Sequence, residues 1–375
     1  MKLFDVYPLY DVTPVKAEGA YVWDDKGDKY LDLYGGHGVI SIGHTHPSYK
    51  AAIETQLSQI GFYSNAIQNP LQLELARKLG ELSGCGDEYA LFLCSTGAEA
   101  NENAIKVASF ENNKSRIIAF KNGFHGRTSG AVSITDNPKI IAPINAHNPV
   151  TILPLNDIEC VKKEIARGDV SSVIIEPIQG VGGLDQPTTA FLKELRKVTQ
   201  ENNVCLILDE VQSGYGRSGK FFAHQHHDVK ADIIPMAKGM GNGFPVGGVL
   251  VHKSIEPWSG MLGTTFGGSH LACAAGIAVL DVMKEEKLME NVSEINTYFK
   301  EQVKSLPGLK QVKGLGLMLG LEFDFEVAAL RKKLIYDHKI FTGGSSNKKL
   351  LRILPPLNVR KSDLEVFIKA LKDLL

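Results

Sequence analysis

Lys238 is the side chain whose setting in this sequence most clearly suggests chemistry. It stands at the end of the apolar run 233–237 and is followed by a glycine-rich loop, 239–243. A lysine is rarely buried without a reason, and burial lowers its pKa, which makes the neutral amine a nucleophile toward carbonyl groups. A surface lysine in a loop is the ordinary alternative, and this segment alone does not decide between the two.

Two adjacent carboxylates, Asp209 and Glu210, follow a second apolar run, 204–208. Because side chains alternate along a strand, the two point to opposite faces, so that one can reach into a ligand crevice while the other turns away. Such acids can bind Mg²⁺ beside a phosphate-binding loop, but no GxxxxGK[ST] motif occurs in this chain. His44 and His46 lack a third and a fourth ligand, so we expect no metal site.

Two further segments combine small residues with groups that bind anions or rings. Ser95 and Thr96 follow a strand-like run and precede a helical pattern with an acidic first turn. Free N–H groups at such a helix start bind phosphate well, although an ordinary N-cap explains the same residues. In the glycine-rich loop 122–128, Phe124 could stack on a flat ring and Arg127 could pair with a carboxylate.

The four segments suit a single cofactor. An aromatic cofactor with an aldehyde and a phosphate needs an amine, a phosphate cradle, a ring-stacking residue and an acid for its pyridine nitrogen. Pyridoxal phosphate (PLP) is that cofactor, and the sequence therefore predicts a PLP site.

Short β-branched runs and longer helical patterns separate these segments and must position them. We expect strands at 89–94, 116–120, 151–155, 172–176, 204–209 and 246–251. Most of these runs are followed by a loop and then by helical spacing, which predicts a mostly parallel sheet covered on both faces. Glycine clusters just after strand ends are where open α/β sheets bind their ligands.

The pattern of the sequence changes near residue 284. Beyond it, Lys/Glu-rich helical patterns flank a hairpin-like stretch at 312–323, and the first residues of the chain show short strand patterns as well. We therefore expect a large PLP-binding domain, 46–283, and a small domain formed by both chain ends, 1–45 and 284–375.

Composition excludes several other classes of protein. The 375 residues include 41 Lys or Arg and 42 Asp or Glu, and this balance excludes the broad positive surface of a nucleic-acid or anionic-membrane binder. Five cysteines without a CxxC pair favour reduced thiols. No signal-peptide core occurs in 1–14, and the apolar stretch 271–283 is too short to span a bilayer, so we expect a soluble, cytoplasmic protein.

The chain resembles the class III (ω-type) PLP-dependent aminotransferases of fold type I, and within them the acetylornithine and succinylornithine group. The resemblance extends from 19–47 to 351–357 and rests on six motifs in order: STGAEAN, FHGRT, EPIQG, LDEVQSGYGRSG, AKGMGNGFPVG and GTTFGG. It implies an α/β fold, with a mostly parallel sheet of the seven-stranded type in the large domain and a smaller α+β domain. It also implies a homodimer with shared active sites.

The resemblance assigns cofactor roles to particular residues. Lys238 would hold PLP through its amine and shuttle the proton, and Asp209 would pair with the pyridine nitrogen. The other expected cofactor-binding residues are Gly97 and Ala98 at the phosphate, Phe124 and Val211 on the ring faces, Gln212 at the ring hydroxyl, Glu210, and Thr265 from the neighbouring subunit.

Substrate roles follow from the same resemblance. Arg127 would bind the α-carboxylate of an N-acylornithine, Arg352 that of glutamate or 2-oxoglutarate, and Thr264 would line the site across the dimer interface. The implied ping-pong reaction moves the δ-amino group of N-acetyl- or N-succinylornithine to 2-oxoglutarate, giving the acylglutamate semialdehyde and glutamate in arginine biosynthesis.

Other functions are compatible with parts of this pattern. An ornithine or 4-aminobutyrate ω-aminotransferase shares the same motifs, and a PLP aminomutase on this scaffold would need no external keto acid. A non-catalytic relative acting as a binding protein is disfavoured, because such relatives are free to lose Lys238 or Asp209.

One residue departs from the family pattern. The family usually reads EPxQGEGG, whereas this chain has Val181 at the place of the second glutamate. In related enzymes that glutamate is thought to mask the arginine matching Arg352 while the donor is bound. We expect its absence to make the pocket more tolerant of a donor with an extra carboxylate, such as N-succinylornithine.

Overall fold

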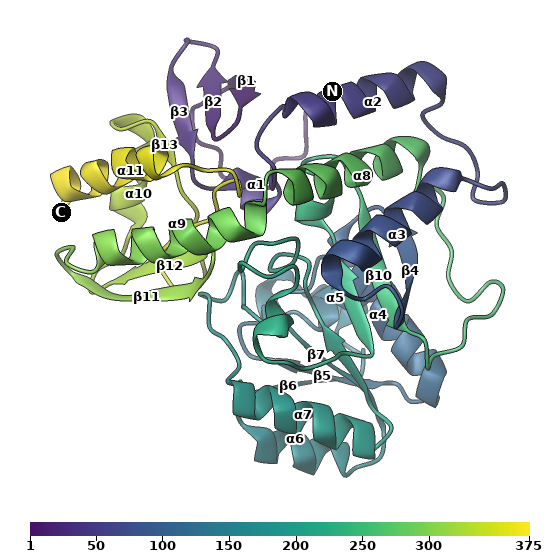
Figure 1. The fold of residues 1–375 in the computed structure, drawn as a ribbon. Helices are drawn as coiled ribbons and strands as arrows, with labels where there is room; N and C mark the ends of the chain where they lie inside the picture. The colour runs from purple at the N-terminus through teal and green to yellow at the C-terminus, as the bar shows by residue number, and fades with distance from the viewer.

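The computed structural model describes residues 1–375 and contains three β-sheets with helices packed around them (Figure 1). The largest sheet has seven strands in the order β4-β10-β9-β8-β7-β5-β6. β10 runs antiparallel to both of its neighbours, and every other pairing in this sheet is parallel. The prediction of a mostly parallel sheet is therefore confirmed. Its strands are β4 (Tyr89–Cys94), β5 (Arg116–Phe120), β6 (Val150–Leu153), β7 (Val170–Ile175), β8 (Cys205–Leu208), β9 (Ile233–Met236) and β10 (Gly247–His252).

The central strands are buried on both faces. Every residue of β7, β8 and β9 is buried, and their sequences are near-continuous apolar runs rather than alternating ones. Such runs are typical of parallel strands that are covered by helices on both sides. Sequence analysis did not predict β9 as a strand. It contains Pro235, which lacks an N–H and normally argues against a central strand.

Helices cover this sheet with their apolar faces. In α7 (Thr189–Glu201) the buried positions Phe191, Leu192, Leu195 and Val198 repeat at helical spacing. α6 (Ile158–Ile165) packs beside α7 along one side of the sheet (Figure 1). The remaining helices of this part are α2 (Pro47–Gln59), α3 (Pro70–Ser83), α4 (Gly97–Asn112), α5 (Ser129–Ser133) and α8 (His270–Glu285), with short 3-10 turns η1 (Pro138–Ile140), η2 (Pro143–Asn145), η3 (Ala223–His226) and η4 (Lys238–Met240).

The two smaller sheets are built from the ends of the chain. One has the order β1-β2-β3-β13, and the other has the order β11-β12-β14. β13 pairs parallel with β3, so that residues 340–341 lie against 31–32. Their strands are β1 (Pro14–Glu18), β2 (Tyr21–Asp24), β3 (Lys29–Asp32), β11 (Leu309–Leu315), β12 (Met318–Phe323), β13 (Ile340–Phe341) and β14 (Leu350–Ile353), and the helices are α1 (Gly35–Gly38), α9 (Leu288–Val303), α10 (Ala328–Tyr336) and α11 (Lys361–Leu374).

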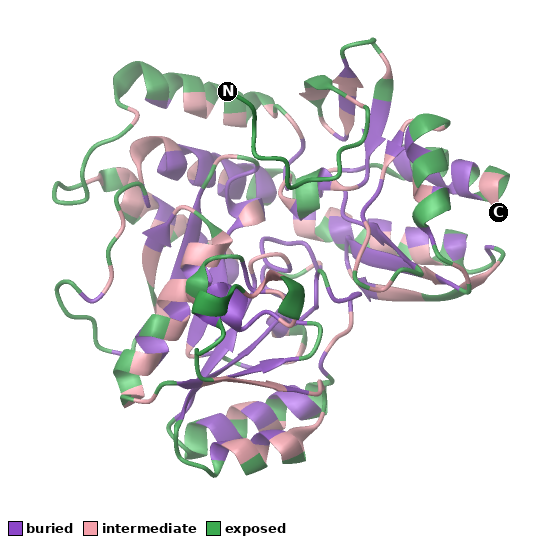
Figure 2. Cartoon of the chain, turned by 180° about the vertical axis from the view of Figure 1, so that it is seen from behind, coloured by how far each residue is buried: buried purple, intermediate pink, exposed green.

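Burial follows the layers of the fold. Buried residues concentrate along the central strands, whereas the outer helix faces and the N-terminal segment 1–10 are exposed (Figure 2). Among all the helices, none is both long and apolar enough to cross a membrane.

Candidate active site

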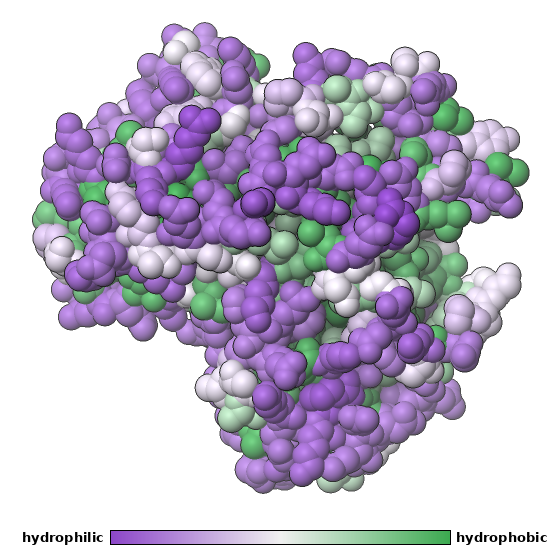
Figure 3. Space-filling model, viewed as in Figure 1, coloured by the Kyte–Doolittle hydropathy of each residue, from purple (hydrophilic) through white to green (hydrophobic).

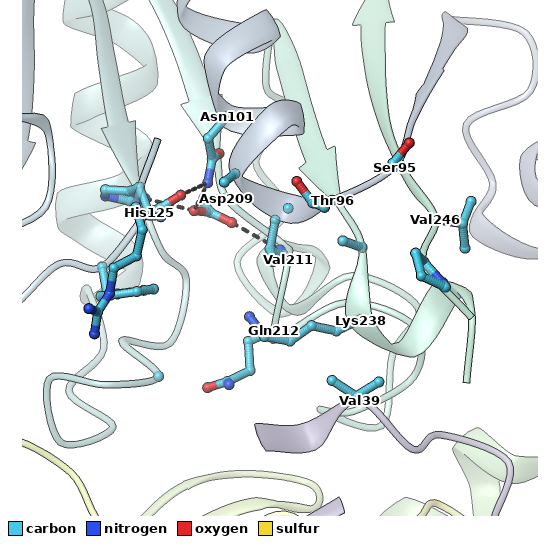
Figure 4. Close-up of a pocket in the computed structure, with 18 of the residues that line it drawn as sticks. Val39, Ser95, Thr96, Asn101, His125, Asp209, Val211, Gln212, Lys238 and Val246 are labelled. Atoms are coloured by element: carbon cyan, nitrogen blue, oxygen red, sulfur yellow. Dashed lines mark hydrogen bonds and ion pairs between the residues drawn. The ribbon is translucent and has the colours of Figure 1, made fainter. Parts of the chain in front are cut away.

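One cavity of about 400 Å³ lies where five strand ends meet (Figure 4). β4 and β9 run in the same direction because both are antiparallel to β10, and β8, β7 and β5 continue parallel to β9. The carboxyl ends of these strands therefore reach the same edge of the sheet, which is where open α/β sheets bind ligands. Each strand contributes a lining residue just beyond its end: Ser95, Phe124, Glu176, Asp209 and Lys238.

Lys238 enters the cavity directly after β9. Its backbone has a φ of +45°, a left-handed conformation that is uncommon for a residue with a side chain. The side chain extends toward Gln212 (Figure 4), and the amine forms no hydrogen bond with the protein. Burial lowers the pKa of the Lys238 amine, although the negative charges of Asp209 and Glu176 act in the opposite direction. A neutral amine in this place is a competent nucleophile.

Asp209 is held in one orientation at the end of β8. Its Oδ2 accepts hydrogen bonds from Asn101 Nδ2 at 2.8 Å and from His125 Nδ1 at 2.6 Å. Its Oδ1 accepts the N–H of Val211 at 3.0 Å (Figure 4). Burial lowers the pKa of His125, but the hydrogen bond and the charge of Asp209 outweigh burial and raise it overall. A fixed carboxylate of this kind can hold a positively charged ring nitrogen.

The start of α4 forms a cradle for an anion. Thr96 is the N-cap, and its Oγ1 accepts the N–H of Glu99 at 3.1 Å. The helix leaves the N–H groups of Gly97 and Ala98 free, and no loop hydrogen bond uses them. A Cβ on Gly97 would lie only 2.5 Å from Cγ1 of Val211, so the close approach requires glycine. The capping interpretation is therefore confirmed, and the two free N–H groups are compatible with the prediction of phosphate binding.

Arg352 lies on β14, just behind the cavity wall. Its guanidinium donates to the carbonyl of Gly180 and, at 3.5 Å, to Oε1 of Gln212. Burial lowers the pKa of Arg352, and no carboxylate contacts it. The amide of Gln212 in turn donates to the carbonyl of His37 at 2.8 Å. Val181, which lines the cavity, is 37% exposed.

Glu176 is a buried acid in the wall that sequence analysis assigned to no role. Its Oε1 accepts the N–H of Phe124 and its Oε2 accepts the N–H of Gly180, both at 2.8 Å. Burial raises the pKa of Glu176 to about 7, and the nearby charge of Asp209 acts in the same direction, whereas His125 opposes both. The sequence signals were its place directly after a buried strand, which it shares with Asp209, and its position at the start of the EPIQG motif.

Asn101 and His125 were also missed as partners of Asp209. Both lie in the motifs on which the resemblance rests, but nothing in their spacing indicates that they meet Asp209. They are 108 and 84 residues away from it along the chain.

The other predicted residues lie in three places. Phe124, Arg127, Val211 and Gln212 line the cavity, and Arg127 is exposed. Glu210 turns away from it: its carboxylate accepts hydrogen bonds from Ser213 Oγ and from the backbone N–H of His224. Adjacent residues of a strand point to opposite faces, as expected for Asp209 and Glu210. The side chain of Glu210 therefore does not contribute to the cofactor site, contrary to the prediction.

Thr264 and Thr265 do not line this cavity in the single chain. Their loop is fixed by Asn65, whose Nδ2 donates to the carbonyls of Thr264 at 3.2 Å and Gly267 at 3.0 Å. Gln72 donates to Asn65 Oδ1 at 2.9 Å and so holds Asn65 in place. No group of three or more His, Cys, Asp or Glu side chains is arranged to hold a metal ion.

Comparison with known proteins defines the class to which this fold and site belong. The model of the aminotransferase class-III family matches residues 6–375, so the chain belongs to this family. The acetylornithine aminotransferase of Aquifex aeolicus is 39% identical over 386 residues, covering 100% of this chain and 99% of that protein.

Solved structures show the same fold. The acetylornithine aminotransferase of Elizabethkingia anophelis aligns with a TM-score of 0.83 and 28% identity, covering 98% of this chain and 94% of that chain. The ornithine aminotransferase of Toxoplasma gondii aligns with a TM-score of 0.89 and 28% identity, covering 97% of this chain and 91% of that chain. That structure has partial occupancy of PLP at its active site.

The residues of the cavity fit pyridoxal phosphate. An unpartnered amine, two free N–H groups at a helix start and a fixed buried carboxylate match the aldehyde, the phosphate and the ring nitrogen of the cofactor. The glycine at position 97 lets the side chain of Val211 pack directly against the start of α4. The protein is thus a PLP-dependent transaminase, and its cofactor is pyridoxal 5'-phosphate.

Proposed function

We propose that this aminotransferase moves the δ-amino group of an N-acylornithine, either N-acetyl- or N-succinylornithine, to 2-oxoglutarate. The products are the acylglutamate semialdehyde and glutamate, and the reaction belongs to arginine biosynthesis. The observation that carries the proposal is the amine of Lys238 in one cavity with the fixed carboxylate of Asp209. Full-length similarity to acetylornithine aminotransferases supports the choice of donor.

We propose that side chains and backbone groups around the cavity hold the cofactor. PLP, when bound, supplies an aldehyde that takes up an amino group and a ring that withdraws electrons from the neighbouring carbon. Lys238 would hold it covalently and move the proton of the donor's δ carbon. Asp209, oriented by His125, would keep the positive charge at the ring nitrogen in place. The first two N–H groups of α4 would bind the phosphate.

Two arginines divide the substrates between them. Arg127 lines the cavity and is exposed, so it is free to pair with the α-carboxylate of the acylornithine. No protein carboxylate pairs with Arg352, so the carboxylate of 2-oxoglutarate has none to displace. Val181, at the place of the family's usual glutamate, adds no negative charge to this wall.

An assay with the purified enzyme tests this function. N-Acetylornithine and 2-oxoglutarate are expected to give glutamate and an aldehyde of matching mass in repeated turnovers, whereas without the keto acid no glutamate should form and the aldehyde should stop at a single turnover. Ornithine is the second candidate donor, because ornithine aminotransferases are among the similar solved structures. A kcat/KM higher for ornithine than for both acylornithines would replace the first choice by the second.

We further propose a homodimer whose subunits share their active sites. Large apolar side chains remain exposed near the loop that carries Thr264 and Thr265, among them Leu73 at 76% and Phe266 at 66%. Phe62 packs on Phe266 with ring centroids 5.4 Å apart. In Figure 3 apolar side chains gather on the surface over α3 and β4. An apolar patch of this kind is typical of a protein interface.

The domain division and the location are also proposals. We propose a large domain, 46–283, and a small one made of 1–45 and 284–375. The pairing of β3 with β13, which brings both chain ends into one sheet, supports this division. Five free cysteines support a reducing compartment, and we propose the cytoplasm.

A further inference from the structure

Glu176 connects two loops that serve different substrates. The loop after β5 carries Phe124 and Arg127, and the loop after β7 carries Gly180 and Val181. One carboxylate receives a backbone N–H from each loop, through a different oxygen. No lysine or arginine contacts this carboxylate, so the two N–H groups are its only direct hydrogen-bond donors.

The free-energy cost of burying the Glu176 carboxylate favours one particular position of each loop. A buried carboxylate costs free energy unless charge-assisted hydrogen bonds compensate for the lost water, and here the two loops supply both bonds. Each loop is therefore stabilised in the position that places its N–H at Glu176. The loops also touch directly, because Gln179 Nε2 donates to the carbonyl of Lys121 at 2.7 Å.

The second loop also contacts Arg352, so its position affects the orientation of that side chain. The N–H of Gly180 is bound to Glu176, and its carbonyl accepts the guanidinium of Arg352. A Cβ at position 180 would clash with the side-chain amide of Gln212, so the Gly180 backbone packs directly against that side chain. A shift of the Gly180 peptide would thus move the acceptor that orients Arg352.

We propose that Glu176 is a positioning residue that couples the ring-stacking loop of Phe124 to Arg352, and so sets the binding of the keto acid together with the seating of the cofactor. The inference rests on the proposed function, since it concerns the arginine assigned there to 2-oxoglutarate. Glu176 itself contacts neither substrate.

Glu176→Gln separates this role from general stability. The two N–H groups bind different oxygens of Glu176, and a glutamine replaces one of these oxygens by an NH2 group, so one loop must lose its bond. Glu102→Gln is a matched control outside the cavity, because Glu102 receives the N–H groups of Gly130 and Ala131 on the same oxygen, Oε1, which a glutamine retains.

Two readouts decide the question. In steady-state kinetics, Glu176→Gln should raise KM for 2-oxoglutarate roughly tenfold, the effect of about one charge-assisted hydrogen bond, and should weaken PLP retention, whereas Glu102→Gln should change neither. In hydrogen exchange of the cofactor-free proteins, peptides covering 122–128 and 178–184 should both exchange faster in Glu176→Gln. If that variant does not fold, Glu176→Asp, whose shorter carboxylate cannot reach both loops, takes its place.

The outcomes are distinct. An unchanged KM for 2-oxoglutarate, or faster exchange in only one of the two loops, overturns the coupling even if the variant is less stable. A wild-type enzyme without acylornithine turnover overturns the proposed function instead, and the exchange experiment still tests whether Glu176 connects the loops.

Discussion

Nδ1 of His125 lies 2.6 Å from Oδ2 of Asp209, and the two side chains are only 1% and 3% exposed. Both residues line the cavity, and the pair fixes the carboxylate on which the ring nitrogen of the cofactor depends. Because the pair is shielded from water, loss of the positive charge on His125 would weaken the contact that orients Asp209.

The raised pKa of His125 predicts the pH dependence of its contribution to stability. The native state binds this proton more tightly than the unfolded chain, so the contribution is complete below the unfolded pKa of about 6.5 and is lost as pH rises through the higher folded pKa. Thermal unfolding of the cofactor-free wild type and His125→Gln should show the largest wild-type advantage at about pH 5 to 6. An advantage that grows toward alkaline pH would contradict this assignment.

Replacement of Arg352 should impair the half-reaction with 2-oxoglutarate but not the half-reaction with the acylornithine. Arg352→Gln is expected to raise KM for 2-oxoglutarate by roughly ten- to a hundredfold and to leave KM for the acylornithine unchanged, because a charged hydrogen-bond donor is lost from one substrate only. Arg127→Gln should raise KM for the acylornithine. Initial-rate measurements with each substrate varied in turn give both constants. Equal effects of Arg352→Gln on both substrates would rule out its assignment to the keto acid.

Val181→Glu tests the departure from the family pattern. A carboxylate at this partly exposed position of the wall would repel a donor with an additional carboxylate. The ratio of kcat/KM for N-succinylornithine to that for N-acetylornithine is expected to fall roughly two- to fivefold, the range of a partly screened charge pair. Val181→Gln, similar in size but neutral, is the control. If the ratio is the same in wild type and Val181→Glu, residue 181 does not select the acyl group.

Phe266→Glu tests the shared active sites. A charge in the middle of the exposed apolar patch should dissociate the dimer, which sedimentation velocity measures directly. If Thr265 contacts the cofactor of the neighbouring subunit, the dissociated protein should also lose PLP more readily. Lys332→Glu, which reverses a charge on the exposed face of α10, is a control for altered charge alone. A monomer that retains PLP as firmly as wild type would show that each site is complete within one chain.

The sequence was informative wherever a local rule decides the structure. Alternation along β8 correctly separated Asp209 from Glu210, and the small residues before α4 correctly marked a helix start with free N–H groups. The mostly parallel sheet followed from apolar runs and from the helical spacing between them.

Contacts between distant segments were beyond such rules. Glu176 receives the N–H of Phe124, 52 residues away, and no periodicity indicates that pairing. β9 was not predicted because it contains Pro235, and a proline disfavours a central strand. In this sheet the strands on either side pair with β9 despite the proline. The partners of Asp209 and Glu176 therefore had to be found in the folded structure.

The most direct test of the central claim, that Lys238 holds PLP and passes amino groups through it, is a visible absorption spectrum of the purified protein. The account predicts a band from the lysine-bound cofactor that N-acetylornithine or N-succinylornithine converts to the pyridoxamine form more efficiently than ornithine or 4-aminobutyrate, that 2-oxoglutarate restores, and that Lys238→Ala lacks. A wild-type protein that stays colourless after PLP is added would contradict it, as would a band in wild type that none of the four donors changes.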